Sequence, residues 1–161
     1  MMKEKSTKAT VMAAAFAGVI CITTMFLHVP SALGGFVTAA DAFVLCAGWM
    51  LSPTYGFLAS GIGSALADII SGHVIYAPIT FLIKGVMAVI ACKTKKEDRV
   101  SHYLWGGAVA ELVMIAGYYL YEGIIYGFLP SLVNIPSNAV QGCVGIILGV
   151  ISIKILSKKP F

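Results

Sequence analysis

The sequence predicts an all-α integral membrane protein, a bundle of six transmembrane helices with both termini in the cytoplasm. Of the 161 residues, 59% are hydrophobic and 11% are charged, whereas a soluble domain has roughly 25% charged residues. The mean hydropathy of +0.93 is spread over the whole length, so several segments must lie in lipid. The basic residues fall in three clusters that six spans place on one side. We expect a single transmembrane domain over residues 1–161.

Helix-breaking residues and charges divide the chain into its expected helices. The first apolar stretch, Ala9 to Leu27, is about 19 residues long, which suits a span and exceeds the roughly 7 to 15 residues of a signal-peptide core. A turn around Pro53 separates the second and third helices, and the segment from Ser71 to Pro78 separates the third and fourth. The expected helices are 8–28, 38–52, 54–71, 77–93, 100–123 and 136–157.

The distribution of basic residues supports this count, because lysine and arginine in short loops stay in the cytoplasm. The three segments expected on the opposite side, 29–40, 71–77 and 124–136, contain no lysine or arginine. A missing or extra helix would scatter the basic clusters over both faces. These clusters comprise Lys3, Lys5 and Lys8; Lys93, Lys95, Lys96 and Arg99; and Lys158 and Lys159.

Small residues recur every four positions on three helices, a spacing that lets helices approach closely in lipid. They are Ala9, Ala13 and Ala17; Ala59, Gly63 and Ala67; and Gly145 and Gly149. Packing within the bundle is one interpretation. For the first helix, whose ladder continues into a smooth alanine-rich surface, docking of a second membrane protein is the other.

No pattern of reactive residues indicates an enzyme, a bound metal or a cofactor. The four cysteines stand singly in apolar segments, without the spacing of zinc ligands or of a disulfide framework. We found no Ser/His/Asp arrangement, HExxH or phosphate-binding loop. We therefore expect no catalytic residues, and this chain alone has no means of hydrolysing ATP.

Charged residues inside membrane spans are costly and usually face a cavity or each other. Lys84 and Glu111 both fall near mid-bilayer when depth is counted at about 1.5 Å per residue. They either form an ion pair or contact a ligand. Asp68 lies one turn before the loop that follows the third helix.

A second set of polar and aromatic residues falls in the outer third of the membrane. Interfacial tyrosines are common, but an aromatic belt does not explain carboxylates and amides at the same depth. A pocket for a small polar, aromatic molecule does, because rings stack on tyrosine while amides and carboxylates bind their edges. The set includes Asp41, Tyr118, Glu122, Asn138 and Gln141.

Three stretches resemble the substrate-binding S components of energy-coupling factor (ECF) vitamin transporters. They are "YGFLASGIGSALAD" at Tyr55 to Asp68, "YAPITFLIKG" at Tyr76 to Gly85 and "NAVQG" at Asn138 to Gly142. An aspartate, Asp41, also opens the second helix, after Ala40 where many relatives have glycine. The resemblance covers nearly the whole chain and is most specific for the branch that includes pyridoxine, hydroxymethylpyrimidine and riboflavin transporters.

This resemblance implies a subunit of the bacterial cell membrane that binds a vitamin from outside and delivers it to a transmembrane T component and two cytoplasmic ATPases. It implies that Ala9, Ala13 and Ala17 form the docking motif, and that the loop from Val29 to Ala40, with Gly34 and Gly35, is a mobile lid. The family's histidine motif for metal substrates is absent. The expected ligand contacts are Asp41, Tyr76, Lys84, Glu111, Tyr118, Glu122, Asn138 and Gln141.

The presence of acidic residues together with one lysine in the expected pocket favours a neutral or weakly cationic heterocycle with hydroxyl groups. Pyridoxine or pyridoxal is the first expectation, followed by hydroxymethylpyrimidine or riboflavin. The alternative function is a stand-alone secondary transporter of a small polar solute, coupled to protons through Glu111 or Asp68. The sequence has no clear inverted repeat, which weighs against this alternative.

Overall fold

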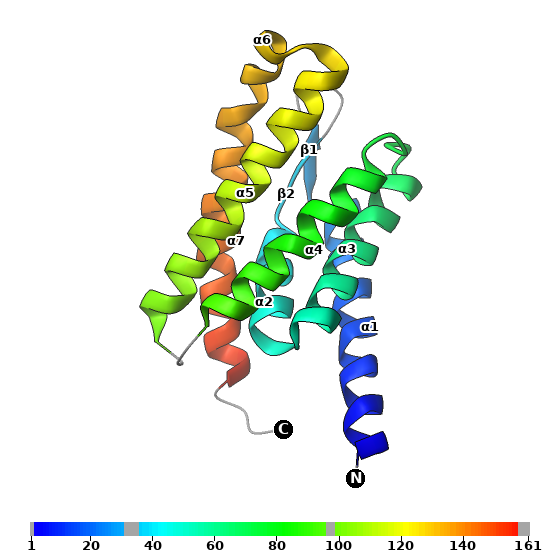
Figure 1. Cartoon of the computed structure of the whole chain (residues 1–161), viewed down its shortest axis with the longest axis vertical. Coiled ribbons are helices and arrows are strands. Elements are labelled where there is room, and N and C mark those ends of the chain that lie inside the picture. The colour runs from blue at the N-terminus through cyan, green and yellow to red at the C-terminus, as the bar shows by residue number, and fades with distance from the viewer. Residues whose placement is uncertain (1, 31–35, 96–98, 158–161) are drawn as a thin grey trace.

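The computed structural model describes residues 2–30, 36–95 and 99–157. Helices dominate this part of the chain and run roughly along the long axis of the molecule (Figure 1). The elements are α1 (Met2–Phe26), β1 (His28–Pro30), β2 (Phe36–Thr38), α2 (Asp41–Met50), α3 (Pro53–Ile70), α4 (Ala77–Thr94), α5 (Val100–Tyr126), α6 (Phe128–Ser131), the 3-10 helix η1 (Leu132–Asn134) and α7 (Ile135–Ser157).

Four helical segments of the described chain are long and apolar enough to cross a membrane. They are Thr7–Phe26, Ala77–Thr94, Val100–Tyr126 and Phe128–Leu156. Helix α2 is apolar but has only 10 residues, and α3 has 18 residues, among them Ser60, Ser64 and Asp68. The chain is therefore a mostly helical, multi-pass membrane protein.

The ends of the molecule contain more structure than the sequence indicated. Within and beside the segment expected as a loop, 29–40, strands β1 and β2 pair as an antiparallel β-ribbon in which Val29 lies opposite Val37. The predicted glycines of the lid, Gly34 and Gly35, lie outside the described residues. Because β2 extends to Thr38, α2 begins at Asp41 and not at 38. The segment 124–136 is likewise not a plain loop, since α5 extends to Tyr126 and α6 and η1 follow.

Local sequence explains where α3 and α4 begin and end. Pro53 and Pro78 lie in the first turns of these helices, where a missing N–H leaves no hydrogen bond unmade. Gly72 follows α3 with φ +83°, a backbone conformation that glycine adopts without strain. The two helices pack closely against each other as an antiparallel pair (Figure 1).

Helix α2 lies at the centre of the bundle, between α4 and α7. Val44, Leu45, Cys46 and Ala47 are all completely buried. Gly48 allows the closest approach to α4, because a Cβ at this position would lie 2.4 Å from the carbonyl oxygen of Ala88. The buried residues of α2 therefore fix the spacing of the helices around them.

The ladders of small residues pack inside the bundle. A Cβ on Gly63 of α3 would lie 2.5 Å from the Ala17 carbonyl oxygen of α1, and Ala13 is buried. On α7, Gly145 and Gly149 contact α2 in the same way. Internal packing, the first of the two interpretations of these ladders, thus accounts for Ala13, Ala17, Gly63, Gly145 and Gly149.

The chain reverses direction so that elements distant in sequence share one end of the bundle. The beginning of α1, the end of α4, the beginning of α5 and the end of α7 lie in the lower half of Figure 1, whereas α6 and the α3–α4 turn lie in the upper half. Of the predicted basic clusters, Lys96, Lys158 and Lys159 lie outside the described residues, as do the side chains of Lys3 and Lys5.

We predict that Gly48→Ala destabilises the protein while Gly18→Ala does not. The new methyl group at position 48 clashes with backbone atoms of α4, and overpacking of this kind costs about 1–3 kcal/mol. Gly18 has nothing within 4 Å of the corresponding position, so alanine there keeps its helix-propensity advantage of about 1 kcal/mol. Thermal melting of both variants in detergent measures the difference. Equal melting temperatures for the two variants would contradict the packing described here.

Candidate functional site

A buried ion pair joins the first turn of α2 to the middle of α4. Asp41 is fully buried and Lys84 is 3% exposed, and Lys84 Nζ donates a hydrogen bond to Asp41 Oδ1. The other carboxylate oxygen, Oδ2, accepts a hydrogen bond from Gln141 Nε2 at 2.6 Å. A buried ion pair is tolerated only when its remaining hydrogen-bonding capacity is satisfied. Gln141 of α7 supplies that partner for Asp41.

Gln141 also connects this ion pair to the β-ribbon. Its Oε1 accepts a hydrogen bond from the backbone N–H of Thr38 at 2.9 Å, and the Thr38 hydroxyl accepts one from the N–H of Ala40 at 3.2 Å. One side chain thus links the end of β2 to Asp41. Displacement of the ribbon from the bundle therefore breaks a hydrogen bond at the ion pair.

A second hydrogen-bonded chain reaches the other side of Lys84. The Tyr118 ring lies 5.7 Å from Lys84 Nζ, within the range of a cation–π contact. The Tyr118 hydroxyl donates to Thr80 Oγ1 at 3.1 Å, and Thr80 and Asp68 line the same cavity. Helices α3, α4 and α5 therefore contribute polar groups to one centre.

These two chains enclose a small polar cavity of about 20 Å³. A space of this size holds about one water molecule, so the walls must separate before a larger ligand can enter. Polar side chains make up the whole lining. They are Thr24, Thr38, Asp41, Ser64, Asp68, Thr80, Lys84, Tyr118 and Gln141.

Glu111 adjoins the ion pair without joining it. It is 3% exposed and neither carboxyl oxygen has a hydrogen-bond partner. A Cβ added to Gly145 would lie 2.8 Å from Asp41 Cβ and 2.9 Å from Glu111 Oε1, so the two acids are neighbours across this glycine. The predicted alternative of a Lys84–Glu111 pair is not observed among the described residues, because α2 brings Asp41 to Lys84 instead.

Glu122 belongs to a separate cluster at the α6 end of the bundle. Its Oε1 accepts hydrogen bonds from the Tyr76 hydroxyl at 3.4 Å and from Asn134 Nδ2 at 2.9 Å. Burial raises the pKa of Tyr76, which keeps its hydroxyl protonated as a donor. The Tyr76 and Tyr121 rings meet edge to face, 5.7 Å apart. This cluster ties the start of α4 to α5 and η1.

The structure thus divides the eight predicted ligand contacts. Asp41, Lys84, Tyr118 and Gln141 line the cavity and Glu111 adjoins it. Tyr76 and Glu122 lie in the separate cluster. Asn138 is buried but does not line the cavity.

The sequence did not point to four of the cavity residues, Thr24, Thr38, Ser64 and Thr80, and Asp68 was expected among the outer polar residues but not as a ligand contact. A usable signal was present for two of the four, because Ser64 lies one helical turn from Asp68 and Thr80 lies one turn from Lys84.

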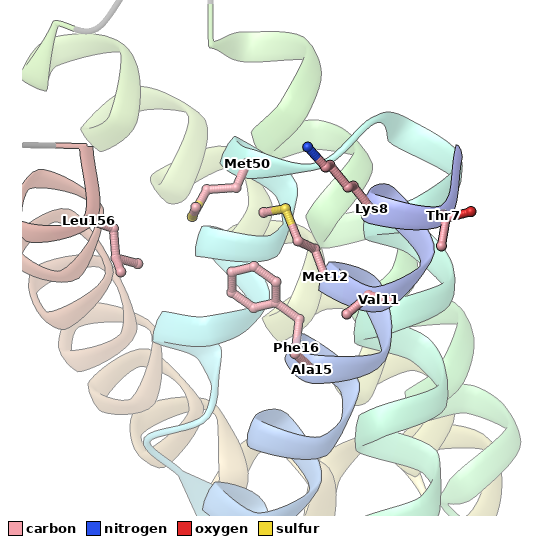
Figure 2. A pocket seen from close by; sticks show the side chains of 8 residues that line it. All are labelled: Thr7, Lys8, Val11, Met12, Ala15, Phe16, Met50 and Leu156. Carbon is pink, nitrogen blue, oxygen red and sulfur yellow. The ribbon is translucent and has the colours of Figure 1, made fainter. Parts of the chain in front are cut away.

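Two apolar grooves flank α1, away from the polar cavity. The first, of about 540 Å³, lies between α1, Met50 and Leu156; Figure 2 shows Met12, Phe16 and Met50 projecting into the space across from Leu156. The second, of about 560 Å³, lies between α1 and α3 and is lined in part by Ala13, Ala14, Ala17 and Gly18. Their nearly apolar walls suit lipid or protein, not a hydrophilic molecule.

We predict that Glu122→Ala destabilises the α6 end of the bundle. The change removes the hydrogen bonds that Glu122 Oε1 accepts from Tyr76 and Asn134, and each hydrogen bond contributes about 0.5–1.5 kcal/mol net. A drop of several degrees in melting temperature in detergent is expected. Ile124→Ala, on the same helix and 79% exposed, is the control and is expected to change little. A Glu122→Ala variant as stable as the wild type would contradict the role assigned to the cluster.

Comparison with known proteins agrees with this architecture. Residues 4–158 match the family described as the ECF-type riboflavin transporter, S component. A Pyrococcus woesei protein, described as an uncharacterized protein in a gap 3′ region, is 31% identical over 132 residues, which cover 81% of this chain and 88% of that protein.

A second relative has a named function. The thiamine precursor transporter HmpT of Lactococcus lactis subsp. cremoris is 25% identical over 121 residues, or 74% of this chain and 69% of HmpT. The family match spans the two polar chains, the ribbon and the bundle that holds them. The chain therefore belongs to the family of ECF-type riboflavin transporter S components.

Proposed function

We propose that this protein is the substrate-binding subunit of an ATP-driven importer for a water-soluble vitamin or vitamin precursor. One observation carries the proposal: a cavity whose lining residues all have polar side chains lies inside a largely apolar helix bundle. Buried polar groups in membrane proteins are costly and mark substrate pathways. The family match and the named thiamine precursor transporter support a vitamin or precursor as that substrate.

The transport arrangement is part of the proposal. Six helices, α1 to α5 and α7, lie in the bacterial cell membrane with both termini in the cytoplasm, and the ribbon faces outside. The 10-residue α2 crosses only part of the membrane. The positions of the basic residues support this orientation. Substrate enters from outside when the ribbon separates from Gln141, and a T component and two ATPase subunits drive its delivery. This chain supplies binding and no catalysis.

The charges at the cavity favour an unphosphorylated ligand. Asp41 and Asp68 line it with a single amine, Lys84, and buried carboxylates oppose the entry of a phosphate group. The description of HmpT as a thiamine precursor transporter supports placing the single-ring compounds pyridoxine, pyridoxal and hydroxymethylpyrimidine before the larger riboflavin.

We predict that the purified protein binds at least one of pyridoxine, hydroxymethylpyrimidine and riboflavin in a calorimetric titration. The phosphate esters of the bound compound are expected to bind at least about tenfold more weakly, a difference of ~1.4 kcal/mol. Failure to bind all three compounds would overturn the proposed substrate class. Equal affinity for a phosphate ester would overturn only the argument from charge and would leave the proposed substrate class in place.

Uptake in cells separates the proposed importer from a stand-alone proton-coupled transporter. The importer needs its ATPase partners and is expected to stop when they are deleted. Uptake that continues without the ATPases and stops when the proton gradient collapses would establish the secondary transporter instead.

We propose that the T component docks along the groove between α1 and α3, over the ladder of Ala9, Ala13 and Ala17. Ala13 and Ala17 line this groove, and small residues there let a partner helix approach. The ladder itself packs on α3. The T component must therefore also cover Ala14 and Gly18, the exposed residues next to the ladder on α1.

We predict that Ala14→Leu reduces partner-dependent uptake by about tenfold, equivalent to ~1.4 kcal/mol of docking energy, without changing ligand affinity. The larger side chain fills the groove but is far from the packed core, because Ala14 is exposed. Val19→Leu, also on the exposed surface of α1 but outside both grooves, is the control. Unimpaired uptake by the Ala14 variant would exclude this groove as the docking surface.

A further inference from the structure

The two sides of the polar cavity differ in whether their polar groups have hydrogen-bond partners. On the first side, Asp41, Lys84, Gln141 and the Thr38 N–H are hydrogen-bonded to one another. On the second, Asp68 Oδ2 and Thr24 Oγ1 are buried and have no hydrogen-bond partner. The two groups come from α3 and α1, and both side chains line the cavity.

Burial makes these two atoms significant. Asp68 and Thr24 are each 3% exposed, and nearly all buried polar groups in proteins have a partner. Leaving one without a partner costs about 1–3 kcal/mol. A single water molecule fits the cavity and can satisfy them in the empty protein. A ligand that replaces this water with its own polar edge recovers the same hydrogen bonds.

We propose that Asp68 and Thr24 form the ligand-recognising edge of the cavity, and that they select a heterocycle bearing an N–H or O–H donor on its ring. This inference rests on the proposed function and specifies which chemical groups of the ligand the site recognises. A carboxylate only accepts hydrogen bonds, whereas a hydroxyl both donates and accepts. The ligand must therefore present a donor to Asp68, and either kind of group to Thr24.

The two aspartates then have different roles. Each oxygen of Asp41 already accepts a hydrogen bond, one from Lys84 and one from Gln141. Asp68 Oδ2 is buried and accepts none. Asp41 positions the helices around the cavity, and Asp68 contacts the ligand.

The candidate ligands all carry a suitable donor. Hydroxymethylpyrimidine has an exocyclic amine, pyridoxine a ring hydroxyl and riboflavin a ring N–H. A protein site built to pair with such a group strongly rejects an analogue that lacks it, because its own polar atoms are then left buried and unpaired. Each ligand can be compared with a matched analogue: the pyrimidine without the amine, pyridoxine without the ring hydroxyl, or riboflavin methylated at the ring nitrogen.

The test is a calorimetric titration of the wild type, Asp68→Asn and Ser60→Ala with whichever of the three compounds the wild type binds most tightly, and with its matched analogue. The wild type is expected to prefer the compound over the analogue by at least tenfold. Asp68→Asn is expected to reduce this preference by weakening the donor-bearing compound, because a neutral amide oxygen accepts a weaker hydrogen bond than a carboxylate. Ser60 is also a buried, unpartnered group of α3 but does not line the cavity, so Ser60→Ala is expected to keep the preference.

The outcomes separate the inference from the function on which it rests. If the wild type binds none of the three compounds, the proposed function fails and the inference fails with it. If the wild type binds one of them and Asp68→Asn keeps the full preference, only the inference is overturned. Should Asp68→Asn not fold, Thr24→Val tests the same edge by removing the hydroxyl at nearly constant volume. An unchanged affinity for the compound in a folded Thr24→Val variant would then overturn the inference.

Discussion

The buried ion pair between Asp41 and Lys84 is the constraint on which the arrangement of this bundle depends. A charge moved from water into the interior costs several kcal/mol, and a paired charge is stable there only with good geometry and further hydrogen bonds. Gln141 meets that need by bonding both Asp41 and the backbone of the β-ribbon. Gly145 contributes by lacking a side chain where Asp41 passes α7. Helices α2, α4 and α7 and the ribbon are therefore held to one another through a few polar atoms.

The positions of the main helices could be predicted from the sequence because long apolar segments end at proline, glycine or clustered charge. The ribbon and α6 could not, since elements of three or four residues show no periodicity. The strand ending at Thr38 matters for the site, because its N–H binds Gln141. Hydropathy likewise did not reveal that the ladder of Ala13 and Ala17 faces α3, because small residues suit internal and external contacts equally.

The candidate site was predicted in part for a related reason. Counting residues gives the depth of a side chain in the membrane but not the direction in which its helix presents it. Lys84 and Glu111 were placed at a common depth, yet α2 supplies the partner of Lys84. Glu122 was placed at the depth of the pocket but bonds Tyr76 and Asn134 elsewhere. Only packing determines which residues at one depth face one another.

An experimental structure of the protein loaded with its ligand tests the central claim most directly. The account predicts density for the ligand ring beside Asp68 and Thr24, with the Asp41–Lys84 pair intact and Gln141 still bonded to the β2 backbone. Density in either apolar groove beside α1, with an empty polar cavity, would contradict the account. So would a loaded structure in which Asp41 and Lys84 are separated by lipid or by apolar side chains.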